Sequence, residues 1–426
     1  MKKRQDSFLK EVTNHIKSKE AKKFIATELE FHLEKSKNTW KEKGLNEIDA
    51  EDKAVEQMGS PIKIGQELNK LHRPRIDWLM VILLVTTMGL GFLPIVSLGN
   101  AGFMDVNHFL RNKVIFVILG AAVAFGMMMI DYRKLEKQGW LFYTIGVIIL
   151  LIINFFSNTI INAAAFVRIG SITIESFMAV PFFFLSWTSF FNNSRLKVWY
   201  LGSLFLLSFY LFLTVASIST VFIYTIMVFV MLWWSKVDKK NALIITVVPI
   251  CLSMIGGLFI WSSIEDYQKE RLLGYLNPEN YANGAGYTYL HLKELISTAG
   301  WFGTTENKEF IESAHTDLVF ASLTYYYGYL FATILVFILS LFTARMIVIS
   351  YKINNHYGKL LLVGGIALYV AQFIYNVGMT LGLFPITSIS LPFISYGLMP
   401  TLFNAFLMGI VLSVYRRKDL TSNNFS

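Results

Sequence analysis

The chain is poor in charge and almost free of cysteine. Only 16% of its 426 residues are Asp, Glu, Lys or Arg, whereas 54% are hydrophobic and 15% are aromatic. A soluble globular chain carries about a quarter charged residues, so this composition excludes an ordinary soluble protein and indicates a membrane protein. Cys251 is the single cysteine and lies in an apolar run. An intramolecular disulfide and a cysteine-based metal cluster are therefore excluded.

An apolar leader and a basic domain are also missing. The first 75 residues are polar, so we expect no cleavable signal peptide. The formal net charge is +9, but the Lys and Arg residues fall in short clusters between apolar runs rather than in one basic domain. We therefore expect no nucleic-acid partner, because clusters of this kind are typical of a membrane protein that is oriented by its positive loops.

Residues 1–75 predict a small cytosolic helical module. Gly44 is a natural stop for the first helical stretch. A second helix is expected to begin at a capping Asp49 and to end at Gly59, and "PIKIGQELNKL" then predicts a third. Apolar residues at helical spacing support the first stretch: Phe8, Val12, Ile16, Ile25, Leu29 and Leu33.

This module resembles the helical prefix domain that precedes membrane proteins in Gram-positive bacteria. The resemblance rests on "ELEFHL", "KGLNEIDAEDKAVEQMGSP" and "IGQEL". It implies an interaction or regulatory role with a cytosolic partner of residues 1–75. The alternative is a solvated helical bundle that has no partner.

The rest of the chain predicts an all-α polytopic membrane protein with about ten transmembrane helices. A bilayer core needs about 20 helical residues to cross it. Apolar runs of that kind centre near residues 78–98, 113–130, 139–156, 173–192, 198–215, 218–235, 242–262, 318–347, 360–383 and 397–415. We expect a membrane domain over 76–418 and a short cytosolic tail over 419–426.

The loop charges predict the orientation. Lys and Arg gather in "DYRKLEKQ", "NNSRLK", "SKVDKK", "ARMIVISYKINNHYGK" and "YRRKD", whereas the loops near 99–112, 157–172, 214–219 and 384–396 hold almost none. Positive loops face the cytosol, so both termini are expected there. The loop over about 263–316 is long, which is typical of a functional or disordered segment. Its aromatic and Gly residues favour an ordered extracytoplasmic cap.

Asp317, in "ESAHTDLVFA", stands where this loop turns into an apolar run. One interpretation is helix capping, in which Thr316 or Asp317 accepts hydrogen bonds from the free N–H groups of the next span. The other is chemistry at the membrane surface. A second unusual stretch places Gln372 and Asn376 on one helix face inside a span, followed by a polar loop with Thr387 and Ser395. Such groups at membrane depth are tolerated mainly where they line a cavity or face protein.

Together these stretches resemble the SEDS (shape, elongation, division and sporulation) family, whose members include FtsW, RodA and SpoVE. The resemblance covers residues 76–418 through "RLLGYLNP", "GAGYTY", "STAGWFG", "AHTDLVFA" and "QFIYNVGMTLGLFPITSISLPFISYG", in that order. It implies a peptidoglycan glycosyltransferase that polymerises lipid II at the outer face of the bacterial cytoplasmic membrane. It also implies a class B penicillin-binding protein as partner, in cell-wall synthesis linked to elongation, division or sporulation.

The resemblance assigns Asp317 as the catalytic base that removes the proton of the acceptor sugar hydroxyl. The pyrophosphate leaving group calls for a cation opposite it. We expect Arg271 in that role, or a divalent ion such as Mg²⁺ or Mn²⁺. The expected substrate-binding residues are Arg271, His315, Thr316, Asn376, Thr387 and Ser395. Each has a structural alternative, such as helix bridging for Asn376.

The chain also departs from the family pattern. Met178 and Pro181 stand where most members carry Glu and Lys, and Tyr325 and Tyr326 replace a Glu pair. A noncatalytic SEDS-like protein that binds a penicillin-binding protein or a lipid-linked precursor therefore competes with the transferase. A lipid-linked precursor transporter is a third hypothesis, but it needs ionisable residues deep in several spans, and those are scarce here.

Overall fold

The computed structural model describes residues 3–72, 74–161, 164–170, 172–247, 266–304, 309 and 311–420. The chain divides into two compact units. The terminal unit runs to Asp77 and includes the segment from Tyr415 onward, and the membrane unit is Trp78–Val414.

The terminal unit contains four helices rather than the three predicted, because the first stretch is interrupted before Ser18, whose side chain caps a separate helix. They are α1 (Lys3–Asn14), α2 (Lys19–Glu42), α3 (Glu47–Met58) and α4 (Pro61–Leu71). Phe8, Val12 and Ile25 are buried in their shared core. The cap predicted at Asp49 is wrong, because Asn46 takes that position and its side chain accepts from the Asp49 N–H at 2.8 Å. Asp49 lies in the first turn, where an N–H needs a partner from outside the helix.

The segment that follows the last membrane helix completes this unit. Leu420 is buried in the same core cluster as Phe8. The Arg417 guanidinium, of which 1% is exposed, donates two hydrogen bonds of 2.8 and 2.9 Å to the Glu20 carboxylate. Asp419 lies 3.3 Å from Arg75. The two ends of the described chain therefore share one core and one ion pair, in which Arg417 is buried and Glu20 is partly exposed.

The membrane unit is built mainly from apolar helices. Six spans of the described chain are long and apolar enough to cross a membrane: Trp78–Asn100, Val106–Met129, Tyr132–Phe156, Val319–Tyr351, His356–Thr380 and Leu398–Arg416. They comprise α5 (Trp78–Leu90) with α6 (Leu93–Asn100), α7 (Val106–Met129), η1 (Tyr132–Gln138) with α8 (Gly139–Phe156), α15 (Val319–Tyr351), α16 (His356–Thr380) and α17 (Leu398–Arg416). The shorter apolar helices are α9 (Val180–Asn192), α10 (Val198–Thr214) and α11 (Ile218–Trp234).

The expected count of ten spans stays a prediction. Residues 242–247 are helical, but the remainder of the predicted span 242–262 lies outside the described residues, as does the start of the long loop near 263. The described helices nevertheless make the chain a multi-pass membrane protein of mainly helical structure.

Three short strands form a small sheet where the sequence predicts a loop and the start of a span. Strands β1 (Thr159–Ile161), β2 (Ala164–Ile169) and β3 (Ile172–Ile174) pair antiparallel in that order. The predicted span 173–192 is wrong at its start, since 3-10 helix η2 (Ser176–Ala179) follows the sheet and α9 begins only at Val180. The β-branched residues of "SITI" satisfy their backbone groups by pairing with β2 instead.

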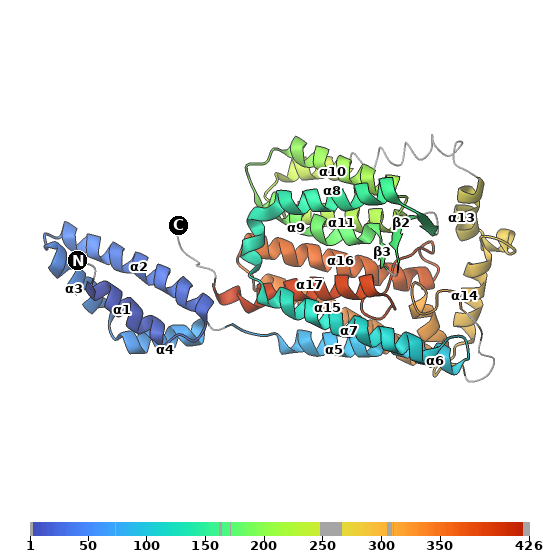
Figure 1. Ribbon diagram of the computed structural model, residues 1–426, viewed down its shortest axis with the longest axis horizontal. Coiled ribbons are helices and arrows are strands. Elements are labelled where there is room, and N and C mark those ends of the chain that lie inside the picture. Colours follow the sequence, from blue (N-terminus) through green and yellow to red (C-terminus); the bar gives the residue numbers. More distant parts are fainter. Residues whose placement is uncertain are drawn as a thin grey trace. The chain divides into compact units, whose positions relative to one another are not determined.

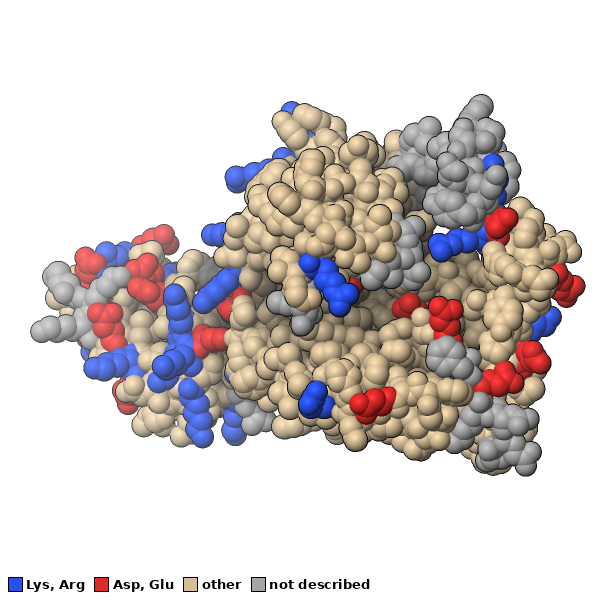
Figure 2. Space-filling model, turned by 45° about the vertical axis from the view of Figure 1, so that its right-hand side comes forward, with Lys and Arg blue, Asp and Glu red and all other residues tan. Residues whose placement is uncertain are grey.

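The membrane helices run side by side, and α16 is packed among α9, α11 and α15 (Figure 1). At one end of the bundle lie the strands and two further helices, α13 (Asp266–Leu276) and α14 (Tyr287–Thr298), joined through 3-10 helix η4 (Pro278–Tyr281). Figure 2 shows a largely uncharged surface on the visible face of this unit. Asp317 lies just before α15, at the end of the bundle that carries the strands.

Candidate functional site

Asp317 sits in a tight turn that ends where α15 begins. Ser313 has a φ of 52°, and its carbonyl accepts from the N–H groups of Thr316 and Leu318 at 3.0 and 3.1 Å. A non-glycine residue at positive φ costs about 1–3 kcal/mol and persists only where its surroundings fix it. The N-cap of α15 is Leu318 and has no side-chain capping bond. The capping interpretation of Asp317 is therefore wrong, and its half-buried carboxylate serves no helix end.

The turn is held by α16 and by the loop that follows it. The carbonyl oxygens of residues 315–317 accept hydrogen bonds from α16 and from the loop after it. The donors are the Tyr396 N–H to His315 at 2.7 Å, the Ser395 hydroxyl to Thr316 at 2.6 Å and the Asn376 side-chain amide to Asp317 at 2.8 Å. The backbone that carries Asp317 is thus fixed residue by residue.

Asn376 and Ser395 each make a second bond that ties the loop to the helix. The Asn376 amide also donates to the Ile389 carbonyl at 2.7 Å, and the Ser395 hydroxyl accepts from the Leu391 N–H at 2.8 Å. Both side chains are fully buried. The structure therefore brings two of the expected substrate-binding residues next to Asp317, where they position its backbone. Their contact with substrate stays a prediction.

Lys113 is a buried cation that the sequence analysis missed. It lies on α7, has no exposed surface, and points its ammonium at three consecutive carbonyl oxygens of the same loop. The Nζ lies 2.9 Å from the Ser395 oxygen and 3.3 Å from those of Phe393 and Ile394. Phe393 has a φ of 65°, so Lys113 holds a strained part of the chain. The available signal was a lysine at the start of the apolar run "VIFVILGAAVAF".

Two carboxyl groups share the site. Burial raises the pKa of Asp317 to about 6, and a hydrogen bond with the Ser388 side chain opposes this rise. Burial also raises the pKa of Glu175 to about 7, and the charge of Asp317 adds to the rise. The first proton is thus lost from Asp317, and its charge keeps Glu175 protonated to higher pH. Between about pH 6 and pH 7, Asp317 is therefore mainly a carboxylate while Glu175 is mainly protonated.

Glu175 was not among the expected site residues. It follows β3 directly, and the sheet brings it close enough to feel the charge of Asp317. The family pattern expects a Glu at Met178, and Glu175 stands three residues earlier. An acid within the apolar stretch "SITIESFMAVP" was the available signal.

The other expected residues lie around the turn or across from it. The His315 ring lies 5.3 Å from that of Phe109 and 5.5 Å from that of Tyr396, and burial lowers its pKa. The Thr316 hydroxyl donates to the Ser313 carbonyl at 3.3 Å, so its side chain braces the turn. These two residues therefore stay beside Asp317.

Thr387 and Arg271 lie farther along the same end of the bundle. Thr387 is half-buried in the loop after α16, next to Ser388. Arg271 is exposed on α13, and its charge acts on Tyr289, whose hydroxyl accepts from the Ile386 N–H at 3.0 Å. Tyr275 of α13 also donates to the Leu383 carbonyl at 2.8 Å. These bonds attach α13 and α14 to the loop after α16, which in turn fixes the backbone of the Asp317 turn.

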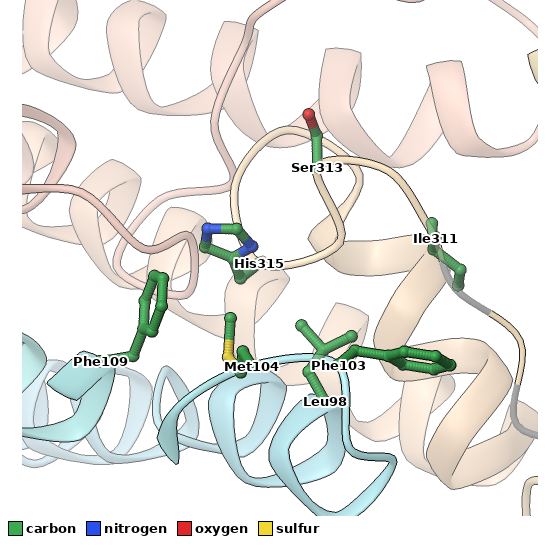
Figure 3. Close-up of a pocket in the computed structure, with 7 residues that line it drawn as sticks. All are labelled: Leu98, Phe103, Met104, Phe109, Ile311, Ser313 and His315. Atoms are coloured by element: carbon green, nitrogen blue, oxygen red, sulfur yellow. The ribbon is translucent and has the colours of Figure 1, made fainter. Parts of the chain in front are cut away.

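A cavity of about 280 Å³ opens beside the turn. Figure 3 shows that it is lined from below by the α6 and α7 region and from above by the segment that leads to His315. Its lining is mostly apolar, with Leu98, Phe103, Met104 and Phe109 from one side. Asp317 does not line it, so the cavity is adjacent to the carboxylate pair rather than around it.

Within the described part of the chain, no three His, Cys, Asp or Glu side chains gather closely enough to hold a metal ion. Asp317 and Glu175 are the carboxyl groups that the site offers. Mg²⁺ commonly binds through one or two carboxylates together with substrate phosphates, so the ionised Asp317 carboxylate fits a metal that arrives with a pyrophosphate.

Comparisons with known proteins agree with the ordered motifs. The family model for FtsW, RodA and SpoVE, described as "Cell cycle protein", matches residues 77–420, and a model named HAAS matches residues 7–67. The chain is 21% identical over 368 residues to a probable peptidoglycan glycosyltransferase FtsW of Trichlorobacter lovleyi, covering 79% of this chain and 92% of that protein.

Two further similarities are informative. Peptidoglycan glycosyltransferase MrdB of Escherichia coli is 28% identical over 199 residues, which cover 45% of this chain and 51% of that protein. A chain from a solved structure described as a peptidoglycan synthase complex that coordinates polymerization and crosslinking superposes with a TM-score of 0.69 at 23% identity. That match covers 80% of this chain and 98% of the other, and it shows a shared fold.

Proposed function

Because the chain belongs to the FtsW, RodA and SpoVE family, we propose that it is a SEDS-type peptidoglycan glycosyltransferase. The names of its curated relatives support this activity, and so does the family-wide match over the membrane unit. The substrate is lipid II, polymerised in the bacterial cytoplasmic membrane for growth of the wall in cell shape, division or sporulation.

Asp317 acts as the general base. Its pKa of about 6 makes it an ionised carboxylate at neutral pH that still accepts a proton readily. The acceptor hydroxyl oxygen attacks the anomeric carbon of the donor sugar while its proton passes to Asp317. The bond between that carbon and the pyrophosphate oxygen breaks, and undecaprenyl pyrophosphate leaves with the electron pair. The hydrogen bonds to the 315–317 carbonyls fix the direction of the carboxylate for this step.

Glu175 supports the same reaction as a neutral acid. Its pKa of about 7 lies above that of Asp317, so below about pH 7 the protonated Glu175 donates a hydrogen bond to the substrate without adding a second negative charge. Arg271 is the cation proposed for the leaving pyrophosphate, and His315, Thr316 and Thr387 are proposed to contact the sugar or phosphate groups. A divalent ion, if bound, would supply charge neutralisation for the pyrophosphate, and the ionised Asp317 carboxylate would hold it.

We further propose a partner protein and an orientation in the membrane. The solved complex named above joins polymerization to crosslinking, which supports a class B penicillin-binding protein as partner of this chain. The clusters of Lys and Arg favour cytosolic termini, so Asp317 faces the outer surface. Residues 1–75 are proposed to regulate the membrane domain, 76–418, through a cytosolic partner.

The test is polymerisation of labelled lipid II by the purified full chain in lipid, alone and with class B penicillin-binding proteins. We expect glycan chains from the wild type and none from Asp317→Asn, which keeps the shape of the side chain but cannot accept the proton. Glu312→Gln is the matched control, because Glu312 is an exposed acid just before the same turn.

Normal polymerisation by a folded Asp317→Asn protein would remove the base assignment. No chains from the wild type under any pairing, beside an active family member in the same assay, would favour the noncatalytic regulator over the transferase.

A further inference from the structure

The turn at residues 300–304 presents two neighbouring aromatic side chains that are largely exposed, although the edge of the Trp301 ring contacts Tyr329. Trp301 is 70% exposed and Phe302 is 82% exposed, the latter more than any other large apolar side chain described. The turn follows α14 directly. We call this segment, Gly300 to Thr304, the aromatic turn.

The aromatic turn is clamped to a kink in membrane helix α15. Gly328 interrupts that helix with a φ of 85° and a ψ of 174°. A Cβ at Gly328 would collide with the Trp301 carbonyl, and one at Gly303 would collide with the Tyr326 carbonyl. Both positions therefore require glycine, and the two backbones touch directly.

Backbone hydrogen bonds across this contact replace those that the kink removes from α15. An uninterrupted helix would pair the Tyr329 N–H with the Tyr325 carbonyl. Instead the Tyr329 N–H donates to the Gly300 carbonyl at 3.0 Å, and the Tyr325 carbonyl accepts from the Thr304 N–H at 3.0 Å. The Leu330 N–H donates to the Trp301 carbonyl at 3.2 Å. Non-helical backbone is tolerated at membrane depth only when its polar groups are satisfied in this way.

The exposed aromatic pair continues an exposed apolar stripe on α15. The residues of this stripe recur at helical spacing: Leu330, Ile334, Phe337 and Leu341, which are 46%, 48%, 66% and 37% exposed. A stripe of this kind on a helix that crosses the membrane faces lipid. Because Leu330 is bonded to the aromatic turn, Trp301 and Phe302 lie at the end of the stripe.

We propose that the aromatic turn is a membrane anchor, in which Trp301 and Phe302 insert into the boundary between lipid headgroups and acyl chains. Aromatic side chains concentrate at that boundary, since their large rings gain from burial in lipid. The occupant of this surface is therefore bilayer lipid. The anchor fixes the height of α14, whose Tyr289 bonds the loop after α16, relative to the membrane surface.

Site-directed spin labelling tests the proposal without reference to enzyme activity. The single cysteine allows a cysteine-free Cys251→Ser background, into which Phe302→Cys is introduced and labelled with a nitroxide. Control labels are placed by Phe337→Cys on the lipid-facing stripe and by Glu279→Cys on the exposed 3-10 helix η4. The full chain is reconstituted in vesicles of phosphatidylglycerol and phosphatidylethanolamine, and collisions with oxygen and with a water-soluble nickel chelate are measured.

We expect the ratio of oxygen to nickel collisions at position 302 to be several-fold above that at 279 and to approach that at 337. Access to nickel equal to that at 279 would overturn the anchor. Protection from both reagents would also overturn it, because protein would then cover the turn. If the label at position 302 disturbs folding, a Trp301→Cys label provides the same measurement one residue away. Both labelled proteins must remain monodisperse, which shows that they are folded.

Discussion

Replacing Lys113 with methionine tests whether the buried cation holds the loop that fixes Asp317. Methionine has a similar length and volume but no donor, so the carbonyl oxygens of residues 393–395 lose their partner. Only the contact to the Ser395 carbonyl, at 2.9 Å, has an ordinary hydrogen-bond length. The loss is therefore dominated by one bond from a charged donor.

Such a bond contributes about 1.5–3 kcal/mol. Since about 1.4 kcal/mol corresponds to a tenfold change, opening of the loop becomes about 10- to 150-fold more favourable. The overall free energy of unfolding changes less, because methionine also removes the cost of burying the ammonium, which amounts to several kcal/mol. The effect is thus expected to be local.

Hydrogen exchange by mass spectrometry is the direct assay. Lys113→Met should speed exchange at the Leu391 and Tyr396 amides, whose partners are the Ser395 hydroxyl and the His315 carbonyl. Lipid II polymerisation should fall together with this protection, and Lys113→Gln, which can still donate, should give intermediate values. Arg111→Met removes an exposed cation from the same helix and should change neither quantity. Unchanged exchange and full activity in a folded Lys113→Met protein would refute the positioning role.

Two further predictions concern titration and the terminal unit. The value of kcat/KM for lipid II should rise as pH increases through about 6, because the base works only when Asp317 has lost its proton; a pH profile checks this. Glu175→Gln should leave the pH at which kcat/KM rises unchanged, since Glu175 is already protonated near pH 6. A shift of that pH would contradict the assigned order of titration. Glu20→Gln should destabilise the terminal unit by about 1.5–3 kcal/mol, because the buried Arg417 guanidinium loses its two hydrogen bonds to a carboxylate. Differential scanning calorimetry of the full chain measures this change.

The apolar runs predicted the membrane helices well because a span must be apolar along its whole length. The predicted segments 318–347 and 397–415 correspond to α15 and α17 with shifts of a few residues at their ends. The sheet at 159–174 was missed because its strands are short, and the β-branched alternation that marks them lies between two apolar runs.

The candidate site was predictable only where polarity stood out. Asp317, Asn376 and Ser395 are polar residues next to apolar runs, and the structure places them together. Lys113 and Glu175 are also charged residues beside apolar runs, but nothing local links them to the 393–395 carbonyls or to Asp317, which are distant in the sequence. Pairings of this kind depend on tertiary contacts, which no local pattern encodes.

The buried Leu420 and Arg417 have a consequence for the order in which the protein is made. Helices α1 to α4 leave the ribosome first, but two side chains of their core and ion pair are encoded about 350 residues later. At about 5–20 residues per second, the nascent terminal unit waits between roughly 17 and 70 seconds for these groups. During that interval its apolar core remains incomplete while the membrane helices are inserted. The core of the terminal unit can therefore be completed only after translation has passed the end of the last membrane helix.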